Sequence, residues 1–413
     1  MQNLDKNEIN VQADDVLRGT LASCKPSSNE LKTLFEQAFL GKKKLRVKLG
    51  IDPTNPDLHF GHTVCLHALR KFQQKGHTPV LIIGGYTATV GDPSGRNETR
   101  PVLTYAEVEK NAKTYLTQVG KFLDLNKTEV CNNYDWFSKF KLSELLELAH
   151  TVTVNQLVAK EAFGSRLEEG NPLYLHEVLY PLLQGYDSVQ VKADIEIGGL
   201  DQTFNILFGR HVQKHFSQKE QLAIFYPLLV GLEGVRKMSK SFLNYIALND
   251  SPDDIYGKSM SINDDLIIQY FSLITDISMD EIRYFAKELD SYQNSRHSKI
   301  TAKELKMKLA KNLVSQIYGD EIAVSAEQNF IAQFKENKIP EMVNEFPLPS
   351  PVKIVDLLFL SKMVPSKTEA KKLIQNGGVK LSSEKVLDPN LLITEKHKNS
   401  IVQIGKRKFV KIV

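Results

Sequence analysis

The sequence lacks several features that would decide its class at once. Its three cysteines, Cys24, Cys65 and Cys131, are far apart and show no metal-ligand spacing. They indicate free thiols in a reducing compartment rather than disulfides. No apolar run approaches the ~20 residues that span a bilayer, and the acidic N-terminus is unlike a signal or transit peptide. We therefore expect a cytoplasmic protein without a membrane segment.

Net charge is also small, +4 over 413 residues, so the total does not indicate a nucleic-acid partner. Its distribution does: residues 351–413 carry 13 Lys and Arg against 5 Asp and Glu, a net charge of +8. Residues 1–350 carry 40 against 44, a net charge of −4. A basic tail on a mildly acidic body is typical of an enzyme with an appended RNA-binding module. The length predicts two or three domains.

A predicted strand runs into a turn and then a helix near the start of the chain. Residues 45–51 alternate apolar with other side chains, which predicts a strand with one face inward. Prolines break the strand, and His-Phe-Gly-His at residues 59–62 then begins a helix that ends at Gly76. A helix N-terminus just past the carboxyl end of a strand suits a phosphate group. On this motif alone, two incidental histidines at a helix start fit equally well.

Later loops are expected at the same edge of the sheet. GGLDQ (residues 198–202) follows a predicted strand, and GVRKMSKS (residues 234–241) follows another at 224–230. Lys237 and Lys240 would suit the charge of a triphosphate during phosphoryl or nucleotidyl transfer. Gly61 would let a flat ring such as a purine lie against the backbone. Each loop alone is more often an ordinary turn, but together they indicate a nucleotide site.

The remaining segments are predicted to be mostly helical. Residues 1–44 resemble a lead-in helix, and residues 125–190 interrupt the strand–helix alternation as an insertion. Capping boxes are expected at Thr104 with Glu107 and at Ser366 with Glu369. The other predicted elements are a strand at 80–83, amphipathic helices from Ser251 to about residue 337, a proline-rich linker, and short strands at 379–381 and 401–413.

Together, these motifs resemble the class I aminoacyl-tRNA synthetases. HFGH, followed some 175 residues later by KMSKS, is similar to the two signature motifs of that family. GIDPT, GDPSG, YPLLQGYD (residues 180–187) and GGLDQ are similar to its bacterial tyrosine-specific branch. The resemblance implies an α/β fold with a Rossmann-like parallel-sheet catalytic domain, a helical insertion that forms the dimer contact, an α-helical anticodon-recognition domain and a small basic α+β RNA-binding domain. The implied bounds are 1–245, about 125–190, 246–340 and 351–413, with a linker at 341–350.

The same resemblance implies the reaction. Such enzymes join L-tyrosine to ATP as tyrosyl-adenylate, release pyrophosphate, and pass the tyrosyl group to the 3′-terminal adenosine of tRNA(Tyr). Mg²⁺ is expected on the ATP phosphates rather than in a metal site of the protein, and a homodimer is expected.

Roles for individual residues also follow from the resemblance. The catalytic positions are His59, His62, Lys237 and Lys240. The ATP-binding positions are Gly50, Asp52, Thr54, Gly61, Asp201 and Lys240, with Arg96 and Arg100 on a loop over the pyrophosphate. The tyrosine-binding positions are Asp92, Tyr180, Gln184, Asp187 and Gln202. The RNA-binding positions are Lys367, Lys371, Lys372 and Lys380.

Spacing supports part of this assignment. Tyr180, Gln184 and Asp187 are four and three residues apart, so a helix would place them on one face. Rejecting phenylalanine requires a buried polar group that only a phenol satisfies, and Asp187 is the candidate. Lys48 departs from many relatives, which have a tyrosine there that donates to the substrate phenol. The second phenol contact is therefore unassigned.

Three other functions remain open at this point. A tryptophan-activating sister enzyme would share the fold, although Asp187 and the GDPSG and GGLDQ spellings favour tyrosine. A non-catalytic RNA-binding scaffold would not need both histidines and both lysines. A nucleotidyltransferase that makes dinucleotide cofactors would leave the helical segment and the basic tail without a purpose.

Overall fold

The computed structural model describes residues 6–18, 21–94, 103–158, 161–294, 298–335, 344–348, 351–361, 363–364, 366–382, 384–405 and 408–413. Its contacts divide the chain into two compact units, residues 1–323 and 324–413. Within the described ranges, every helix is too short or too polar to cross a membrane.

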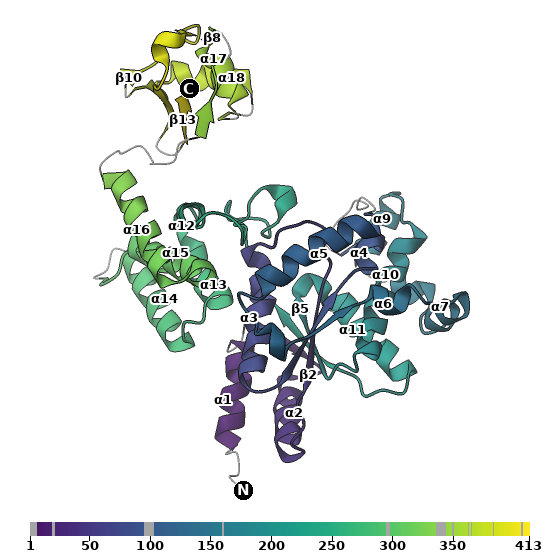
Figure 1. Cartoon of the computed structure of the whole chain (residues 1–413). Helices are drawn as coiled ribbons and strands as arrows, with labels where there is room; N and C mark the ends of the chain where they lie inside the picture. Colours follow the sequence, from purple (N-terminus) through teal and green to yellow (C-terminus); the bar gives the residue numbers. More distant parts are fainter. Residues whose placement is uncertain are drawn as a thin grey trace. The chain divides into compact units, whose positions relative to one another are not determined.

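A six-stranded sheet of order β1-β6-β5-β2-β3-β4 forms the centre of the first unit (Figure 1). All neighbouring strands are parallel except β1, which pairs antiparallel with β6. The order reverses direction between β2 and β5, and the carboxyl ends of strands at such a switch point are where ligands bind. The predicted Rossmann-like fold class is confirmed. The strands are β1 Ser23–Lys25, β2 Arg46–Ile51, β3 Thr78–Ile83, β4 Glu129–Asn132, β5 Ile195–Gly199 and β6 Leu222–Tyr226.

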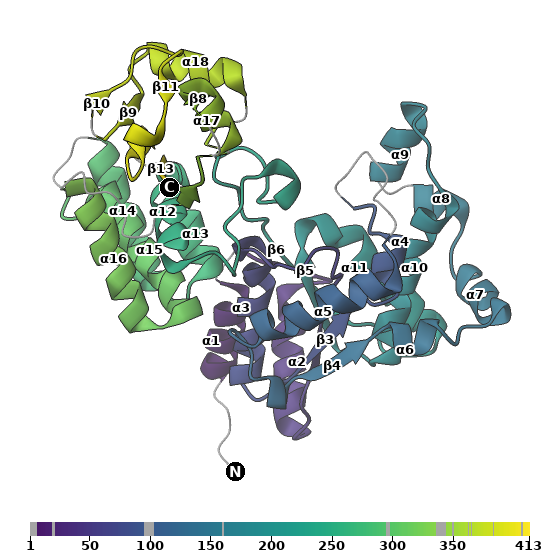
Figure 2. The same cartoon turned by 45° about the horizontal axis from the view of Figure 1, so that its top comes forward.

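Helices cover the sheet, and one of them begins at a capping box that the sequence predicts. Thr104 and Glu107 form the expected capping box on α5. The helices of this part are α1 Lys6–Leu17, α2 Ser28–Leu40, α3 Phe60–Gln74, α4 Thr87–Val90, α5 Tyr105–Val119, α6 Tyr134–Phe137, α7 Leu142–Ala149, α8 Val154–Val158, α9 Glu161–Glu168, α10 Leu175–Gln190 and α11 Thr203–His215. Figure 2 shows α7, α8 and α9 on the outer side of α10, away from the sheet.

Two details of this unit differ from the sequence prediction. Residues 125–190 are not helical throughout, because β4 pairs with β3 at the edge of the sheet. A four-residue edge strand of sequence Glu-Val-Cys-Asn has no apolar run to reveal it. Residues 1–44 hold two helices and strand β1 rather than one helix.

The burial of the β2 side chains also differs from the alternation of inward and outward positions that the sequence predicts. Val47, Lys48 and Leu49 are all buried. A parallel sheet is covered on both faces, so alternation no longer separates buried from exposed positions. Lys48 therefore points into the interior, where a charged group needs partners.

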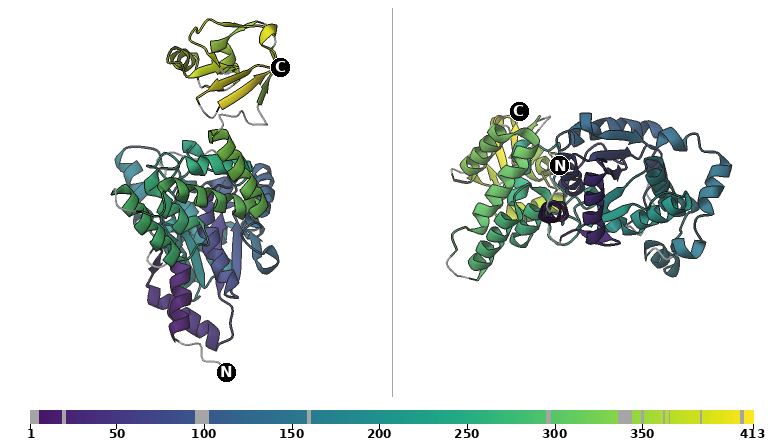
Figure 3. Two further views of the ribbon diagram at one scale, coloured as in Figure 1. Left: turned by 90° about the vertical axis from the view of Figure 1, so that its left-hand side faces the viewer. Right: turned by 90° about the horizontal axis from the view of Figure 1, so that it is seen from below.

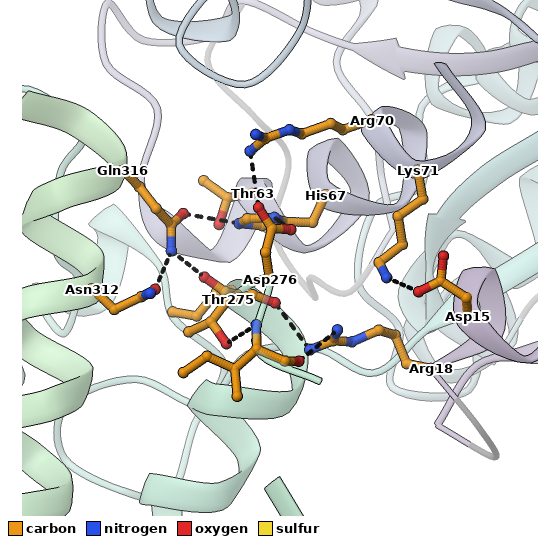
Figure 4. A network of polar contacts seen from close by, with 12 residues as sticks. Asp15, Arg18, Thr63, His67, Arg70, Lys71, Thr275, Asp276, Asn312 and Gln316 are labelled. Atoms are coloured by element: carbon orange, nitrogen blue, oxygen red, sulfur yellow. Dashed lines mark hydrogen bonds and ion pairs between the residues drawn. The ribbon is translucent and has the colours of Figure 1, made fainter. Parts of the chain in front are cut away.

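Helices α12–α15 continue the first unit and contact its sheet-containing part through α3 (Figure 4). His67, on α3, is buried, with its imidazole nitrogens 3.2 Å from Asp276 Oδ1 and 3.0 Å from Gln316 Oε1. Ser251 caps α12 as predicted. The helices are α12 Pro252–Met260, α13 Ile267–Ile274, α14 Met279–Gln293 and α15 Ala302–Tyr318, followed by α16 Asp320–Lys335.

Arg18, just after α1, joins the chain's start to the same helices (Figure 4). Its buried guanidinium donates to four backbone carbonyls at the end of α13 and beyond it. The acceptors are Phe271, Ser272, Thr275 and Ile277. These bonds satisfy carbonyls that a helix end leaves without intrahelical partners.

The second unit has its own sheet, of order β10-β9-β12-β13-β7, and its own apolar core (Figure 3). Strand β7 lies inside the predicted linker 341–350 and pairs with β13, so this stretch is more than a spacer. Ser366 caps α18, accepting from the Glu369 N–H at 3.2 Å. The elements are β7 Asn344–Phe346, β8 Val352–Lys353, α17 Ile354–Leu360, α18 Lys367–Gln375, β9 Val379–Leu381, β10 Glu384–Lys385, β11 Leu392–Ile393, β12 Ile401–Ile404 and β13 Lys408–Ile412.

Candidate active site

A pocket of about 970 Å³ opens at the carboxyl ends of β2 and β5. Its size suits a small-molecule ligand. All the described members of the predicted catalytic, ATP-binding and tyrosine-binding sets line it, whereas Arg96 and Arg100 lie outside the described residues. The lining members are Gly50, Asp52, Thr54, His59, Gly61, His62, Asp92, Tyr180, Gln184, Asp187, Asp201, Gln202, Lys237 and Lys240.

The two histidines of HFGH cap the N-terminus of α3. His59 Nδ1 accepts the Gly61 N–H at 3.1 Å, and His62 Nδ1 accepts the His59 N–H at 3.2 Å. Burial lowers the pKa of His62 to about 4 and holds the pKa of His59 far below its usual range. Both imidazoles are therefore neutral at pH 7. His59, whose Nδ1 accepts the Gly61 N–H, carries its proton on Nε2, whereas His62 Nδ1 also lies 3.3 Å from the His59 carbonyl. Each neutral ring has one N–H that can act as a hydrogen-bond donor.

The His59 cap gives Gly61 a structural reason to be glycine. A Cβ at Gly61 would lie 2.9 Å from His59 Nδ1 and 3.6 Å from Met238 Cβ. A side chain here would therefore collide with the His59 imidazole. Gly61 also lines the pocket, where the sequence predicts a flat ring against the backbone.

The KMSKS loop contacts both other motifs of the pocket. Lys237 Nζ forms an ion pair with Asp201 Oδ2 at 2.7 Å, which joins the loop to GGLDQ. Lys240 Nζ donates to the Asp57 carbonyl, just ahead of HFGH. Burial lowers the pKa of Lys240, although Asp57 opposes this effect. Lys237 and Lys240, which were expected to contact the phosphates of ATP, are thus bonded to oxygen atoms of the protein.

Asn244, which the sequence did not single out, fixes the shape of this loop. Its Oδ1 accepts the Ser239 N–H at 2.8 Å, and its Nδ2 donates to the Lys237 carbonyl at 3.1 Å and to Glu233 Oε1 at 2.8 Å. The side chain is buried. A Cβ at Gly231 would lie 2.1 Å from Asn244 Nδ2, so glycine there makes room for this contact.

On the opposite side of the pocket, polar groups surround Asp92. Gln202 Nε2 donates to Asp92 Oδ2 at 2.7 Å, and the Ser94 N–H donates to Oδ1 at 2.9 Å. Asn205, also missed from the sequence, is fully buried and donates to Gln202 Oε1 at 3.0 Å. Donors from Gln202 and Ser94 therefore hold the carboxyl group of Asp92 in place, and Asn205 holds Gln202.

Tyr180 and Asp52, predicted for different substrates, are bonded to each other. The Tyr180 hydroxyl donates to Asp52 Oδ2 at 2.9 Å, and Thr87 Oγ1 donates to Asp52 Oδ1 at 2.8 Å. A Cβ at Gly84 would lie 1.9 Å from Asp52 Oδ1, so this glycine permits the contact. Hydrogen bonds thus join a residue predicted to bind ATP to a residue predicted to bind tyrosine.

The deep end of the pocket is formed by Asp187, which is buried on α10. Trp136 Nε1 donates to its Oδ1 at 3.0 Å, and Asn133 Nδ2 donates to its Oδ2 at 3.2 Å. Burial raises the pKa of Asp187 to about 7, although these donors and Lys48 favour the carboxylate. Sequence reasoning missed Asn133 because it missed the strand just before it, β4.

Together, the parallel sheet and the paired HFGH and KMSKS segments define a class I aminoacyl-tRNA synthetase. Residues 41–335 match the family of class I tRNA synthetases (W and Y). Residues 331–412 match the tyrosine–tRNA ligase SYY-like C-terminal domain. The chain belongs to the tyrosine–tRNA ligase family.

Individual relatives support this placement along the whole chain. The chain is 41% identical to a tyrosine–tRNA ligase of Carboxydothermus hydrogenoformans, over 98% of both chains. It is 43% identical to one of Thermotoga maritima, over 90% of this chain and 91% of the relative. A truncated mitochondrial tyrosyl-tRNA synthetase of Aspergillus nidulans shares the fold, with a TM-score of 0.63 and 22% identity over 79% of this chain and 98% of that one.

Proposed function

We propose that this chain is an ATP-dependent tyrosine–tRNA ligase that forms tyrosyl-adenylate and then tyrosyl-tRNA(Tyr). The main support is a single pocket that joins a nucleotide end, made by HFGH and KMSKS, to a deep end closed by Asp187. A phenol would place its hydroxyl at Asp187 and add a hydrogen bond there, whereas phenylalanine would bring an apolar ring edge against that buried acid.

In the first step, a carboxylate oxygen of tyrosine attacks the α-phosphorus of ATP and pyrophosphate leaves. In the second, a ribose hydroxyl of the tRNA attacks the tyrosyl carbonyl and AMP leaves. The attacking carboxylate is already ionised, so the first step needs positioning and charge stabilisation rather than a base. The imidazole N–H groups of His59 and His62 and the ammonium groups of Lys237 and Lys240 would supply that stabilisation. Mg²⁺ would enter on the phosphates, which are oxygen ligands that it prefers.

We assign the substrate ammonium to the acceptors around Asp92. Asp92 is buried, Gln202 donates to it, and Gln184 lies on the same helix face as Asp187. A cationic ammonium beside a carboxylate forms a short, strong hydrogen bond. Tyr180 would contribute through Asp52, to which it donates. Gly50, Thr54, Gly61 and Asp201 would border the nucleotide.

The insertion supports the proposed homodimer. Apolar side chains of α7 and of the segments around it are exposed, with Leu142 at 72% and Leu175 at 75%. Leu146 and Val154 are exposed as well. Exposed apolar side chains on neighbouring helices of one insertion are the kind of surface that a protein partner can cover. A second copy of this chain is the partner that we propose for it.

The second unit supports tRNA binding. Lys371 and Lys372 are exposed on α18, and Lys380 is half-buried on β9. Lys367 forms an ion pair with Asp356 Oδ1 at 2.7 Å, which reduces its value as a phosphate contact. We propose that this basic surface binds the phosphate backbone and that the helices α12–α15 contact the anticodon arm. The proposed location of the enzyme is the cytoplasm.

The test is amino-acid-dependent exchange of labelled pyrophosphate into ATP, compared for tyrosine, tryptophan and phenylalanine. Exchange with tyrosine alone is expected, and K240A should reduce it about a hundredfold. K303A, which removes an exposed lysine outside the pocket, is the matched control. Exchange with tryptophan would overturn the assignment of Asp187, and no exchange with any amino acid would favour the scaffold function.

A further inference from the structure

The deep end of the pocket holds a charged pair that has no role in the function proposed above. Lys48 on β2 and Glu196 on β5 both line the pocket, with Nζ 3.0 Å from Oε1. Their side chains are 0% and 2% exposed. A fully buried ion pair is often no more stable than an apolar pair of similar size. Its presence at a ligand site therefore calls for a functional reason.

Lys48 is bonded to protein groups rather than left free for a substrate phenol. Its ammonium contacts the Gln184 carbonyl at 2.9 Å, Ser188 Oγ at 2.7 Å and Glu196 Oε1 at 3.0 Å. An ammonium has three N–H donors and no acceptor. These three contacts use all of its donors, so the substrate phenol is left to another group.

Glu196 fixes the same neighbours from the other side. Gln184 Nε2 donates to Glu196 Oε1 at 3.2 Å, and Ser188 Oγ donates to Oε2 at 3.0 Å. Gln221 also donates to Oε2. The pair thus holds Gln184 by its backbone carbonyl and by its side-chain amide.

Asp187 lies on α10 one turn after Gln184. The charges of Lys48 and Glu196 affect its ionisation. The charged groups that act on it among the described residues are Lys48 from β2, which favours its carboxylate, and Glu196 from β5, which disfavours it. Asn133 links it through Thr87 to Asp52, the nearest carboxylate on that side. A phenol donates a stronger hydrogen bond to a carboxylate than to a neutral acid.

We propose that Lys48 and Glu196 are a positioning pair for phenol selection: they fix Gln184 and hold a positive charge beside Asp187, so that Asp187 accepts the substrate phenol as a carboxylate. This inference rests on the proposed function, because it assumes that tyrosine is the amino acid bound. It also gives a role to Lys48, whose role the sequence left open: Lys48 positions other groups and does not itself contact the substrate phenol.

Two variants of this pair should shift the pKa of Asp187 in opposite directions. E196Q removes a negative charge and keeps Lys48, so the pKa of Asp187 should fall. K48M/E196Q removes both charges, and because the effect of Lys48 is the larger, the pKa should rise. The double variant is preferred to K48M alone, which would leave Glu196 buried without its partner.

The single tryptophan of the chain reports this ionisation directly. Trp136 is the only tryptophan in 413 residues, and it donates to Asp187. Its fluorescence in the ligand-free enzyme should change with pH with a midpoint near 7. The midpoint should move down in E196Q and up in K48M/E196Q, and D187N should abolish the transition. R166M/E177Q, which removes another buried ion pair, is the matched control and should keep the wild-type midpoint.

Selectivity is measured as the ratio of kcat/KM for tyrosine and phenylalanine in pyrophosphate exchange. At pH 7.5, K48M/E196Q should lower this ratio about tenfold, since a charge-assisted hydrogen bond is replaced by a neutral one. E196Q should shift the acid limb of kcat/KM for tyrosine to lower pH.

Unchanged midpoints in both charge variants, or an unchanged tyrosine-to-phenylalanine ratio, would reduce the pair to a structural contact and overturn the proposal. E196Q keeps the ammonium, so it tests the direction of the shift even where the double variant fails to fold. Failure of the proposed function would appear differently, as absence of tyrosine-dependent exchange in the wild-type enzyme. The fluorescence titration needs no substrate.

Discussion

The proton of the His59 imidazole resides on Nε2, because its Nδ1 accepts the Gly61 N–H, and burial keeps the His62 imidazole neutral as well. The two rings therefore act as neutral donors rather than as acids. For His62, whose pKa burial lowers to about 4, charge is gained only as the pH falls toward 4. Catalysis near neutral pH should not depend on its protonation.

Replacement of His62 by alanine should lower kcat for adenylate formation about a hundredfold, with little change in KM for tyrosine. H62Q should retain part of the rate, because its amide keeps a donor in the side chain. At saturating substrates, wild type and H62Q should share one pH dependence between pH 6 and 9. An inflection near pH 6.5 that is present in wild type and absent from H62Q would show that His62 titrates there, contrary to the structure.

At the residue scale, sequence reasoning found side chains that belong to signature motifs and missed those that hold them. His59, Asp187 and Lys240 were found because they lie in recognisable strings. Asn205 and Asn244 were missed, since single asparagines inside a helix or after a loop carry no pattern. Lys48 was noticed only as a departure, although a lysine between two apolar residues of a parallel strand predicts a buried partner.

At the scale of elements, the KMSKS loop has its shape fixed from within by Asn244. N244A should remove three hydrogen bonds and let the loop adopt other conformations. We expect kcat for adenylate formation to fall about tenfold and the unfolding free energy to fall by about 1–3 kcal/mol. Tyrosine binding without ATP, followed by Trp136 fluorescence, should change little, because Asp187 does not contact the loop.

The matched control for that variant is N294A, whose amide bonds within the last turn of α14. A comparable fall in kcat for N294A would indicate a general loss of stability rather than an effect on the loop.

Elements with strong periodicity or caps were predictable, and short edge elements were not. The helices α5, α12 and α18 begin at predicted caps. The edge strands β1, β4 and β7 have three or four residues each and are fixed by pairing with distant strands. Such pairing is a tertiary effect, which no local window of sequence contains.

At the scale of the whole molecule, the charge of the second unit should affect tRNA rather than adenylate formation. K371E/K372E should leave pyrophosphate exchange unchanged and raise KM for tRNA(Tyr) about tenfold at moderate salt. The slope of log affinity against log salt should shrink by about two, one for each lost phosphate contact. K396E/K398E makes the same change of charge elsewhere in the unit, and an equal effect there would mean that α18 is not the contact.

Arg18 has a consequence for the order in which the chain can fold during synthesis. Its acceptor at Ser272 lies 254 residues further along the chain. At roughly 5–20 residues per second, a ribosome makes Arg18 on the order of ten to fifty seconds before those carbonyls exist. Until then, docking of α1 would bury a guanidinium without acceptors, which is strongly unfavourable. The segment around Arg18 therefore leaves the ribosome well before its acceptors are made and is among the last to reach its native place, and a nascent-chain chaperone would find it accessible throughout that interval.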